Sequence, residues 1–120
     1  MRNPRQRLGQ WGEQVASDYL AARGYTIPDR NFRTRHGEID IVARREEVLI
    51  FVEIKTRSSS AYAFPEESVT RQKQLHLLSA AEDYLASHPQ TSLTWQIDVI
   101  AIEGRPGIKL SINHFENVLA

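Results

Sequence analysis

The sequence predicts an α/β domain in which helices flank a mixed five-stranded sheet, with the elements in the order α-β-β-β-α-β-β. An amphipathic stretch comes first, and two apolar strands joined by a short polar link follow it. A second helix then separates the latter of these strands from another apolar strand. A short link makes two strands antiparallel, whereas a helical connection makes them parallel through a right-handed crossover. The sheet is therefore expected to be mixed.

Apolar residues at spacings of three and four predict the first helix, and Gly24 suits its C-terminal cap; they are Leu8, Trp11, Val15 and Tyr19. Strands are expected at 25–33, 39–43 and 48–56, because residues 44–47 are few enough for a hairpin.

Pro65, followed by two glutamates, is typical of a helix start, and this second helix is expected to run to about Ser87. Two further strands, at 95–102 and 108–115, are separated by a turn at 104–107 that contains two glycines.

Length and composition indicate a single domain spanning residues 1–120. Hydrophobic residues make up 41% and charged residues 25%, which is ordinary for a globular protein. The absence of cysteine excludes disulfides, thiolate zinc sites and cysteine nucleophiles. No apolar run is long enough for a membrane helix and no signal peptide is visible. We expect a cytoplasmic protein without a membrane partner.

The net charge is zero, which argues against a purely electrostatic nucleic-acid binder. Residues 1–73 nevertheless hold 13 Lys and Arg against 10 Asp and Glu. Three arginines lie within residues 30–36. This run is either a solvated loop or a surface for phosphates.

Glu53 is the feature that most needs an explanation, because it interrupts an apolar strand, where a carboxylate is costly unless it is paired. A two-residue hairpin loop at Glu46-Glu47 would put Asp40 directly across from Glu53, with Cβ atoms about 5 Å apart. Lys55 would lie on the same face. A shared proton, neutralisation by Lys55, or a divalent cation would each relieve the repulsion between the two carboxylates.

At this point the sequence resembles a known family. Asp40, followed after thirteen residues by Glu53-Ile54-Lys55, is similar to the PD-(D/E)xK motif of the restriction-endonuclease-like nuclease superfamily, with Ile39 in place of the proline. More closely, the chain resembles the YraN family of uncharacterised bacterial proteins, relatives of archaeal Holliday-junction resolvases. The matching stretches span residues 9 to 102 and include Gly12-Glu13, Gly37–Asp40, Phe51–Arg57 and Ala80–Leu85.

The resemblance implies a restriction-endonuclease-like domain with Asp40, Glu53 and Lys55 as catalytic residues. Metal ligands would be Glu13, Asp40, Glu53 and the carbonyl of Ile54, holding one or two Mg²⁺ or Mn²⁺ ions. Contacts to nucleic acid would come from Arg33, Arg35, Arg57 and Lys73.

Two functions follow. The first is a Mg²⁺-dependent endonuclease hydrolysing DNA, including branched DNA, where a homodimer would supply two sites. The alternative is a catalytically inactive nucleic-acid-binding or adaptor module that keeps the nuclease fold; a protein-interaction domain with a purely structural acidic cluster is a third reading.

Several residues keep two readings. Glu13 is either a ligand or an exposed acid of the first helical turn, and Glu38 is either an outer partner of the site or a surface ion pair. Lys73 either extends to water or reaches a phosphate. The histidines at 36, 76, 88 and 114 are expected at the surface, with His36 near phosphate. Asp98 receives no role.

Overall fold

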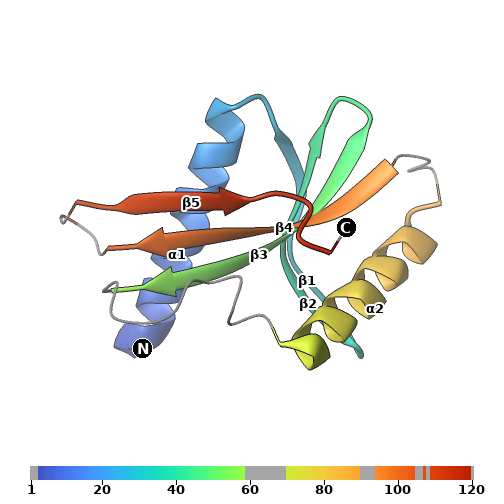
Figure 1. Cartoon of the computed structure of the whole chain (residues 1–120), viewed down its shortest axis with the longest axis horizontal. Coiled ribbons are helices and arrows are strands. Elements are labelled where there is room, and N and C mark those ends of the chain that lie inside the picture. The colour runs from blue at the N-terminus through green and yellow to red at the C-terminus, as the bar shows by residue number, and fades with distance from the viewer. Residues whose placement is uncertain (1–2, 59–69, 90–93, 105–106, 108, 120) are drawn as a thin grey trace.

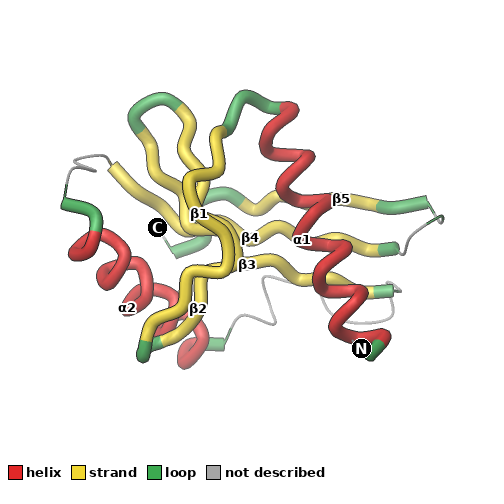
Figure 2. The backbone as a smooth tube through the Cα atoms, turned by 180° about the vertical axis from the view of Figure 1, so that it is seen from behind, coloured by secondary structure: helices red, strands yellow, loops and turns green. Residues whose placement is uncertain are grey.

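A computed structural model describes residues 3–58, 70–89, 94–104, 107 and 109–119. These residues form a mixed sheet in the order β1-β2-β3-β4-β5, with α1 on one face and α2 on the other (Figures 1 and 2). The elements are α1 (Pro4–Ala22), β1 (Thr26–Thr34), β2 (Gly37–Arg45), β3 (Val48–Arg57), α2 (Arg71–Ser87), β4 (Thr94–Glu103) and β5 (Ser111–Phe115). The predicted order α-β-β-β-α-β-β is confirmed.

The pairing of the strands matches the expectation of a mixed sheet. β3 and β4, which α2 connects, are parallel, and the other three neighbouring pairs are antiparallel. The hairpin between β2 and β3 has Glu46 and Glu47 as its loop, with Glu46 at φ 55°. This short loop fixes the register that places the acidic residues further along both strands.

α1 is stabilised at both ends. The Asn3 side chain accepts from the Gln6 N–H while Gln6 reaches back to the Asn3 N–H, which forms a capping box. After the helix, Gly24 adopts φ 87°, a conformation that favours glycine, so the predicted cap is confirmed. The helix buries Gly12, Ala16 and Leu20, one turn apart, against the sheet.

α2 begins at Arg71, directly after its capping residue. Thr70 has an extended backbone, with φ −64° and ψ 163°, and its hydroxyl accepts from the Lys73 N–H, which caps the helix at Arg71. The start expected at Pro65 lies outside the described residues. The helix ends at Ser87, as expected.

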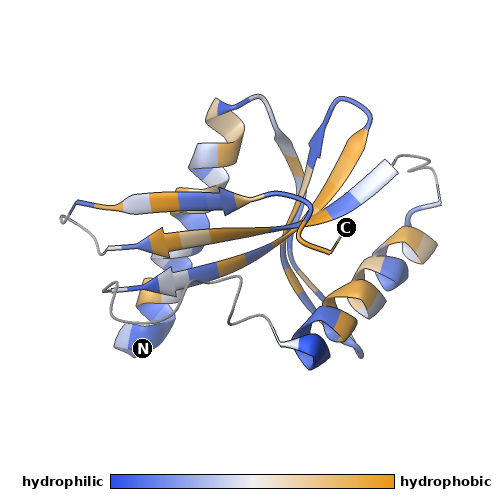
Figure 3. Cartoon of the chain, in the orientation of Figure 1, coloured by the Kyte–Doolittle hydropathy of each residue, from blue (hydrophilic) through white to orange (hydrophobic). Residues whose placement is uncertain are grey.

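The sheet separates two hydrophobic cores. One core lies under α2 and contains Phe51, Tyr84 and Val99, whereas the other lies under α1 and contains Leu20, Val52 and Ile100. Figure 3 shows hydrophobic residues concentrated along β3 and β4, the strands that both helices cover. Neither helix in the described ranges has the length and apolarity needed to span a bilayer.

Candidate metal and nucleic-acid site at a strand fork

β2 and β3 separate at the two acidic residues of the motif. Their backbone pairing runs from Arg45↔Val48 to Ile41↔Val52, which confirms the predicted register over five pairs. The described pairing stops one step before Asp40 would face Glu53. Beyond this point a carboxylate oxygen of Asp40 accepts the Ile54 N–H at 2.8 Å, so a side chain replaces the ladder partner. We call this opening the fork.

The alternation of side chains breaks at the fork. Ile41 belongs to the core under α1, as strand periodicity requires, but Ile39, two residues earlier, belongs to the core under α2. Asn31 stands between the pairs Arg30↔Ile41 and Phe32↔Ile39, across from Asp40, and has φ 54°. This irregularity turns the Asp40 carboxylate into the opening. The expectation of a regular cross-strand pair on one face is therefore wrong in detail.

The pKa of the Asp40 carboxyl group is raised above its usual value. Burial contributes most to raising its pKa, and the negative charge of Glu53 adds to this, so that the pKa of Asp40 reaches about 7. The hydrogen bond from Ile54 opposes the rise without cancelling it. At neutral pH both the protonated and the ionised forms of this carboxyl group are therefore populated, and a bound cation would favour the ionised form.

Glu53 lies deeper, with 5% of its surface exposed, and two lysines approach it. Its Oε1 is 3.8 Å from Lys55 Nζ on the same strand and 3.4 Å from Lys73 Nζ on α2. Both lysine side chains are partly exposed, at 30% for Lys55 and 42% for Lys73. The neutralising partner expected at Lys55 is therefore joined by a second lysine, which reaches the site from α2.

An open groove of about 910 Å³ leads to the fork from the α1 side. Asp40, Ile54 and Thr56 form part of its wall. Basic and amide side chains from α1 and β1 complete the wall, among them Arg5, Gln10, Gln14, Arg30 and Arg33. Glu13 and Glu38 also line the groove, so its three arginines face three acidic side chains and the polar wall carries no excess of positive charge.

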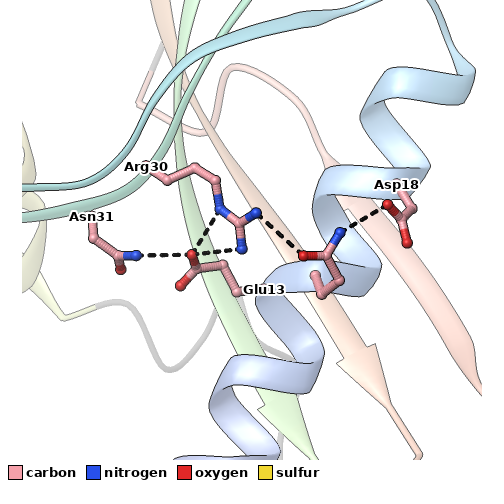
Figure 4. A network of polar contacts seen from close by, with 5 residues as sticks. Glu13, Asp18, Arg30 and Asn31 are labelled. Carbon is pink, nitrogen blue, oxygen red and sulfur yellow. Dashed lines mark hydrogen bonds and ion pairs between the residues drawn. The ribbon is translucent and has the colours of Figure 1, made fainter.

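Glu13 lies in this groove but is held by β1. Its Oε1 accepts from Arg30 Nε at 3.0 Å and from Asn31 Nδ2 at 2.9 Å, and Gln14 joins the network (Figure 4). The side chain is only 15% exposed. Because α1 begins at Pro4, Glu13 is not an acid of the first helical turn, and that reading is wrong.

Gly12 allows α1 to approach the fork. A β-carbon at Gly12 would overlap the side chain of Thr56, which follows Lys55 on β3. The close approach brings Glu13, the next residue on the helix, to the edge of the groove. The glycine is therefore required for the spacing between helix and strand.

The remaining predicted contacts are scattered around the groove and the strand ends. Arg33 forms an ion pair with Glu38 at 3.4 Å, which supports the surface-pair reading of Glu38. Arg57 contacts Glu103 at 3.4 Å, at the carboxyl end of β3. Arg35 is exposed in the turn between β1 and β2.

The histidines are not all surface residues. His36 is 42% exposed and contacts Asp83 at 2.8 Å, whereas the side chain of His114 is only 10% exposed. Its Nε2 lies 2.7 Å from Asp98 Oδ2, and Asp98 is fully buried. The surface assignment of His114 is therefore wrong.

Asp98, His114 and Glu116 form a polar cluster that the sequence reasoning missed. Among the described residues, they are the one set of three or more acidic or histidine side chains whose ligand atoms all lie within 4.8 Å of one another. Glu13, Asp40 and Glu53 are not drawn together to that extent. A signal for the cluster existed, since the β4–β5 hairpin pairs Val99 with Phe115 and so places Asp98 opposite Glu116 one step further.

The fold and the fork together define the class of the protein: an α/β domain with a five-stranded mixed sheet. Asp40 lines the groove on the α1 side where β2 and β3 separate, whereas Glu53 contacts Lys55 and, on α2, Lys73. Residues 12–102 match the family described as "Uncharacterised protein family UPF0102". The chain belongs to this family, which is the YraN family, so the predicted membership of that family is confirmed.

Relatives match over nearly the whole chain. A UPF0102 protein of Syntrophotalea carbinolica is 46% identical over 108 residues, covering 90% of this chain and 87% of its own. One of Syntrophomonas wolfei is 44% identical over 110 residues, covering 92% and 95%. One of Chlorobaculum tepidum is 45% identical over 114 residues, covering 95% and 88%.

Proposed function

We propose that this protein is a divalent-metal-dependent endonuclease that hydrolyses phosphodiester bonds in DNA, including branched DNA. The observation that carries the proposal is the carboxyl group of Asp40, whose pKa is raised to about 7 beside buried Glu53, at the wall of an open groove. Perturbed carboxylates in a cleft are typical of functional sites. A divalent cation is the simplest partner for two adjacent carboxylates.

The donor set at the fork fits Mg²⁺ or Mn²⁺, because the available ligands are oxygens. Asp40, Glu53 and the backbone carbonyl of Ile54 would hold one or two ions, and Glu13 would contribute once Arg30 and Asn31 release it. A bound ion would polarise the phosphoryl group and promote ionisation of water.

Lys55 carries the role of a positioning and charge-stabilising group. Its ammonium lies 3.8 Å from Glu53 and its side chain is 30% exposed, so it could contact both Glu53 and an incoming phosphate. There it would orient the attacking water and stabilise the negative charge that develops on the phosphate. Lys73 adds a second positive charge from α2.

The arginines would hold the nucleic acid rather than read its sequence. Arg33 is 80% exposed at the groove, and Arg35 follows it on the exposed turn. Together with Arg57 they would contact backbone phosphates, which fix position and carry no sequence information.

The test is incubation with branched, duplex and single-stranded DNA in the presence of Mg²⁺ or Mn²⁺. We expect cleavage, and we expect Asp40→Asn and Lys55→Met each to reduce the rate by at least about a hundredfold. Lys109→Met is the matched control, because Lys109 is exposed and is not among the residues that line the groove. Cleavage that survives Asp40→Asn would contradict the proposal.

A second candidate is the non-catalytic nucleic-acid-binding module. The observation in its favour is that Lys55 and Lys73 already balance the charge of Glu53. It predicts DNA binding without cleavage, unchanged by Asp40→Asn, with either ion present. The same incubation, followed by a binding assay, separates the two functions.

A further inference from the structure

Asp98 is a buried carboxylate that the proposed function does not use. It lies in β4 with no exposed surface, on the same side of the sheet as Ile100 and the core under α1. Its Oδ1 accepts from Gln96 Nε2 and from the Asn117 N–H, both at 2.9 Å. These two donors fix the carboxylate plane, so Oδ2 is the oxygen that faces His114.

His114 is oriented just as firmly. Its Nε2 is 2.7 Å from Asp98 Oδ2, and its Nδ1 is 3.1 Å from the hydroxyl of Tyr19 on α1. An ionised carboxylate only accepts hydrogen bonds, so Nε2 carries a proton here. The Tyr19 hydroxyl can donate or accept, so it fits either tautomer of the ring.

Glu116 opens this pair to solvent. It is exposed, it follows β5 directly, and with Gln96 and Tyr25 it lines a cavity of about 300 Å³. A ligand atom from each of Asp98, His114 and Glu116 falls within 4.8 Å of the others. Two ligands of one tetrahedral Zn²⁺ ion, each about 2.1 Å from it, lie about 3.4 Å apart. His114 Nε2 and Asp98 Oδ2, which are 2.7 Å apart as a hydrogen-bonded pair, therefore need to separate only slightly to hold an ion.

We propose that Asp98, His114 and Glu116 form a binding site for a first-row transition-metal ion, with Zn²⁺ as the representative. The ion enters from the cavity beside Glu116 and takes the place of the proton on His114 Nε2. The neutral ring then carries its one proton on Nδ1, from which it donates a hydrogen bond to the Tyr19 hydroxyl. Gln96, Asn117 and Tyr19 hold the ligands from behind, an arrangement found around metal-binding carboxylates and histidines. The site joins β4, β5 and the segment after β5.

The ligand chemistry distinguishes this site from the fork. An imidazole nitrogen favours Zn²⁺ over Mg²⁺, whereas the all-oxygen fork favours Mg²⁺ and Mn²⁺. The inference does not depend on nuclease activity, and either proposal can fail alone.

The experiment is calorimetric titration of the full chain with Zn²⁺, together with ¹⁵N NMR of the histidine rings. We expect one equivalent to bind in the wild type and in Asp40→Asn, with at least tenfold weaker binding in Glu116→Gln and His114→Gln. Glu116→Gln tests the site without disturbing a buried group, and Glu82→Gln on α2 is the matched surface control, expected to bind as the wild type does. At saturation the hydrogen on the His114 ring moves from Nε2 to Nδ1, and Mg²⁺ does not produce this change.

Three results would overturn the inference. They are no Zn²⁺ binding, binding that Glu116→Gln leaves unchanged, and a His114 ring that keeps its hydrogen on Nε2 at saturation. The last two indicate an adventitious ion only, and the first indicates a purely structural hydrogen-bond network.

Discussion

Two aspartates with little access to solvent lie in this sheet, and their surroundings are opposite. Asp98 receives three hydrogen bonds, from Gln96, His114 and the Asn117 N–H. Asp40 receives one, from Ile54, and faces the like charge of Glu53, which helps raise its pKa to about 7. A buried carboxylate with several hydrogen-bond donors is compatible with a stable fold. A carboxylate that faces a like charge lowers stability, and such unfavourable positions are typical of functional sites.

The largest loss of stability is expected at Asp98, whose buried carboxylate is fully hydrogen-bonded. Asp98→Ala leaves His114, Gln96 and the Asn117 N–H without their acceptor, and should lower the free energy of unfolding by about 3–5 kcal/mol in urea denaturation. Asp83→Ala is the control, because Asp83 pairs with His36 at 2.8 Å but is 35% exposed. If the two variants lose the same free energy of unfolding, the buried hydrogen bonds of Asp98 contribute no more to stability than the exposed pair of Asp83.

Asp40→Asn should act in the opposite direction. The folded protein binds the Asp40 proton more tightly than the unfolded chain does, so stability falls as pH rises from about 4 to about 7. Asparagine still accepts from Ile54 and cannot ionise, so it should raise stability above pH 7 by on the order of 2–4 kcal/mol.

The measurement is urea denaturation across this pH range. The wild-type curve should decline through the window and the variant curve should be flatter. Parallel curves for the two proteins would mean that Asp40 is not under electrostatic strain.

Gly12→Ala probes the approach of α1 to the fork. The added methyl group overlaps the Thr56 side chain, so we expect a loss of about 1–3 kcal/mol, measured by thermal melting. Gly9→Ala is the control, because a β-carbon there meets nothing within 4 Å. Equal melting temperatures in the two variants would show that the helix does not need this close contact.

Arg33→Ala should change stability least. Its pair with Glu38 is exposed, so the free energy of unfolding should stay within about 0.5 kcal/mol of the wild type. If Arg33 contacts a phosphate, the slope of log affinity for DNA against log salt should fall by about one. An unchanged slope in a filter-binding series would remove Arg33 from the interface.

Hydrophobic periodicity and one short hairpin were enough to predict the fold and the register as far as Ile41↔Val52. The break in alternation at Asp40 was not predictable, because it depends on the left-handed backbone of Asn31 on a neighbouring strand. The contact of Lys73 with Glu53 depends on how α2 docks, which local sequence does not encode. The pairing of β4 with β5 places Asp98 opposite Glu116, whereas the contact of Asp98 with His114, which pairs with Ile100, does not follow from the register alone.

The most direct test of the fork is thermal melting near pH 8 with increasing Mg²⁺, for the wild type and Asp40→Asn. A metal site stabilises the wild type by about 2.7 kcal/mol when the ion is at a hundred times its Kd, and the melting temperature continues to rise with concentration. We predict this rise in the wild type and a flat response in Asp40→Asn. A wild-type curve as flat as that of the variant, or a variant that rises in parallel, would contradict a metal site built on Asp40.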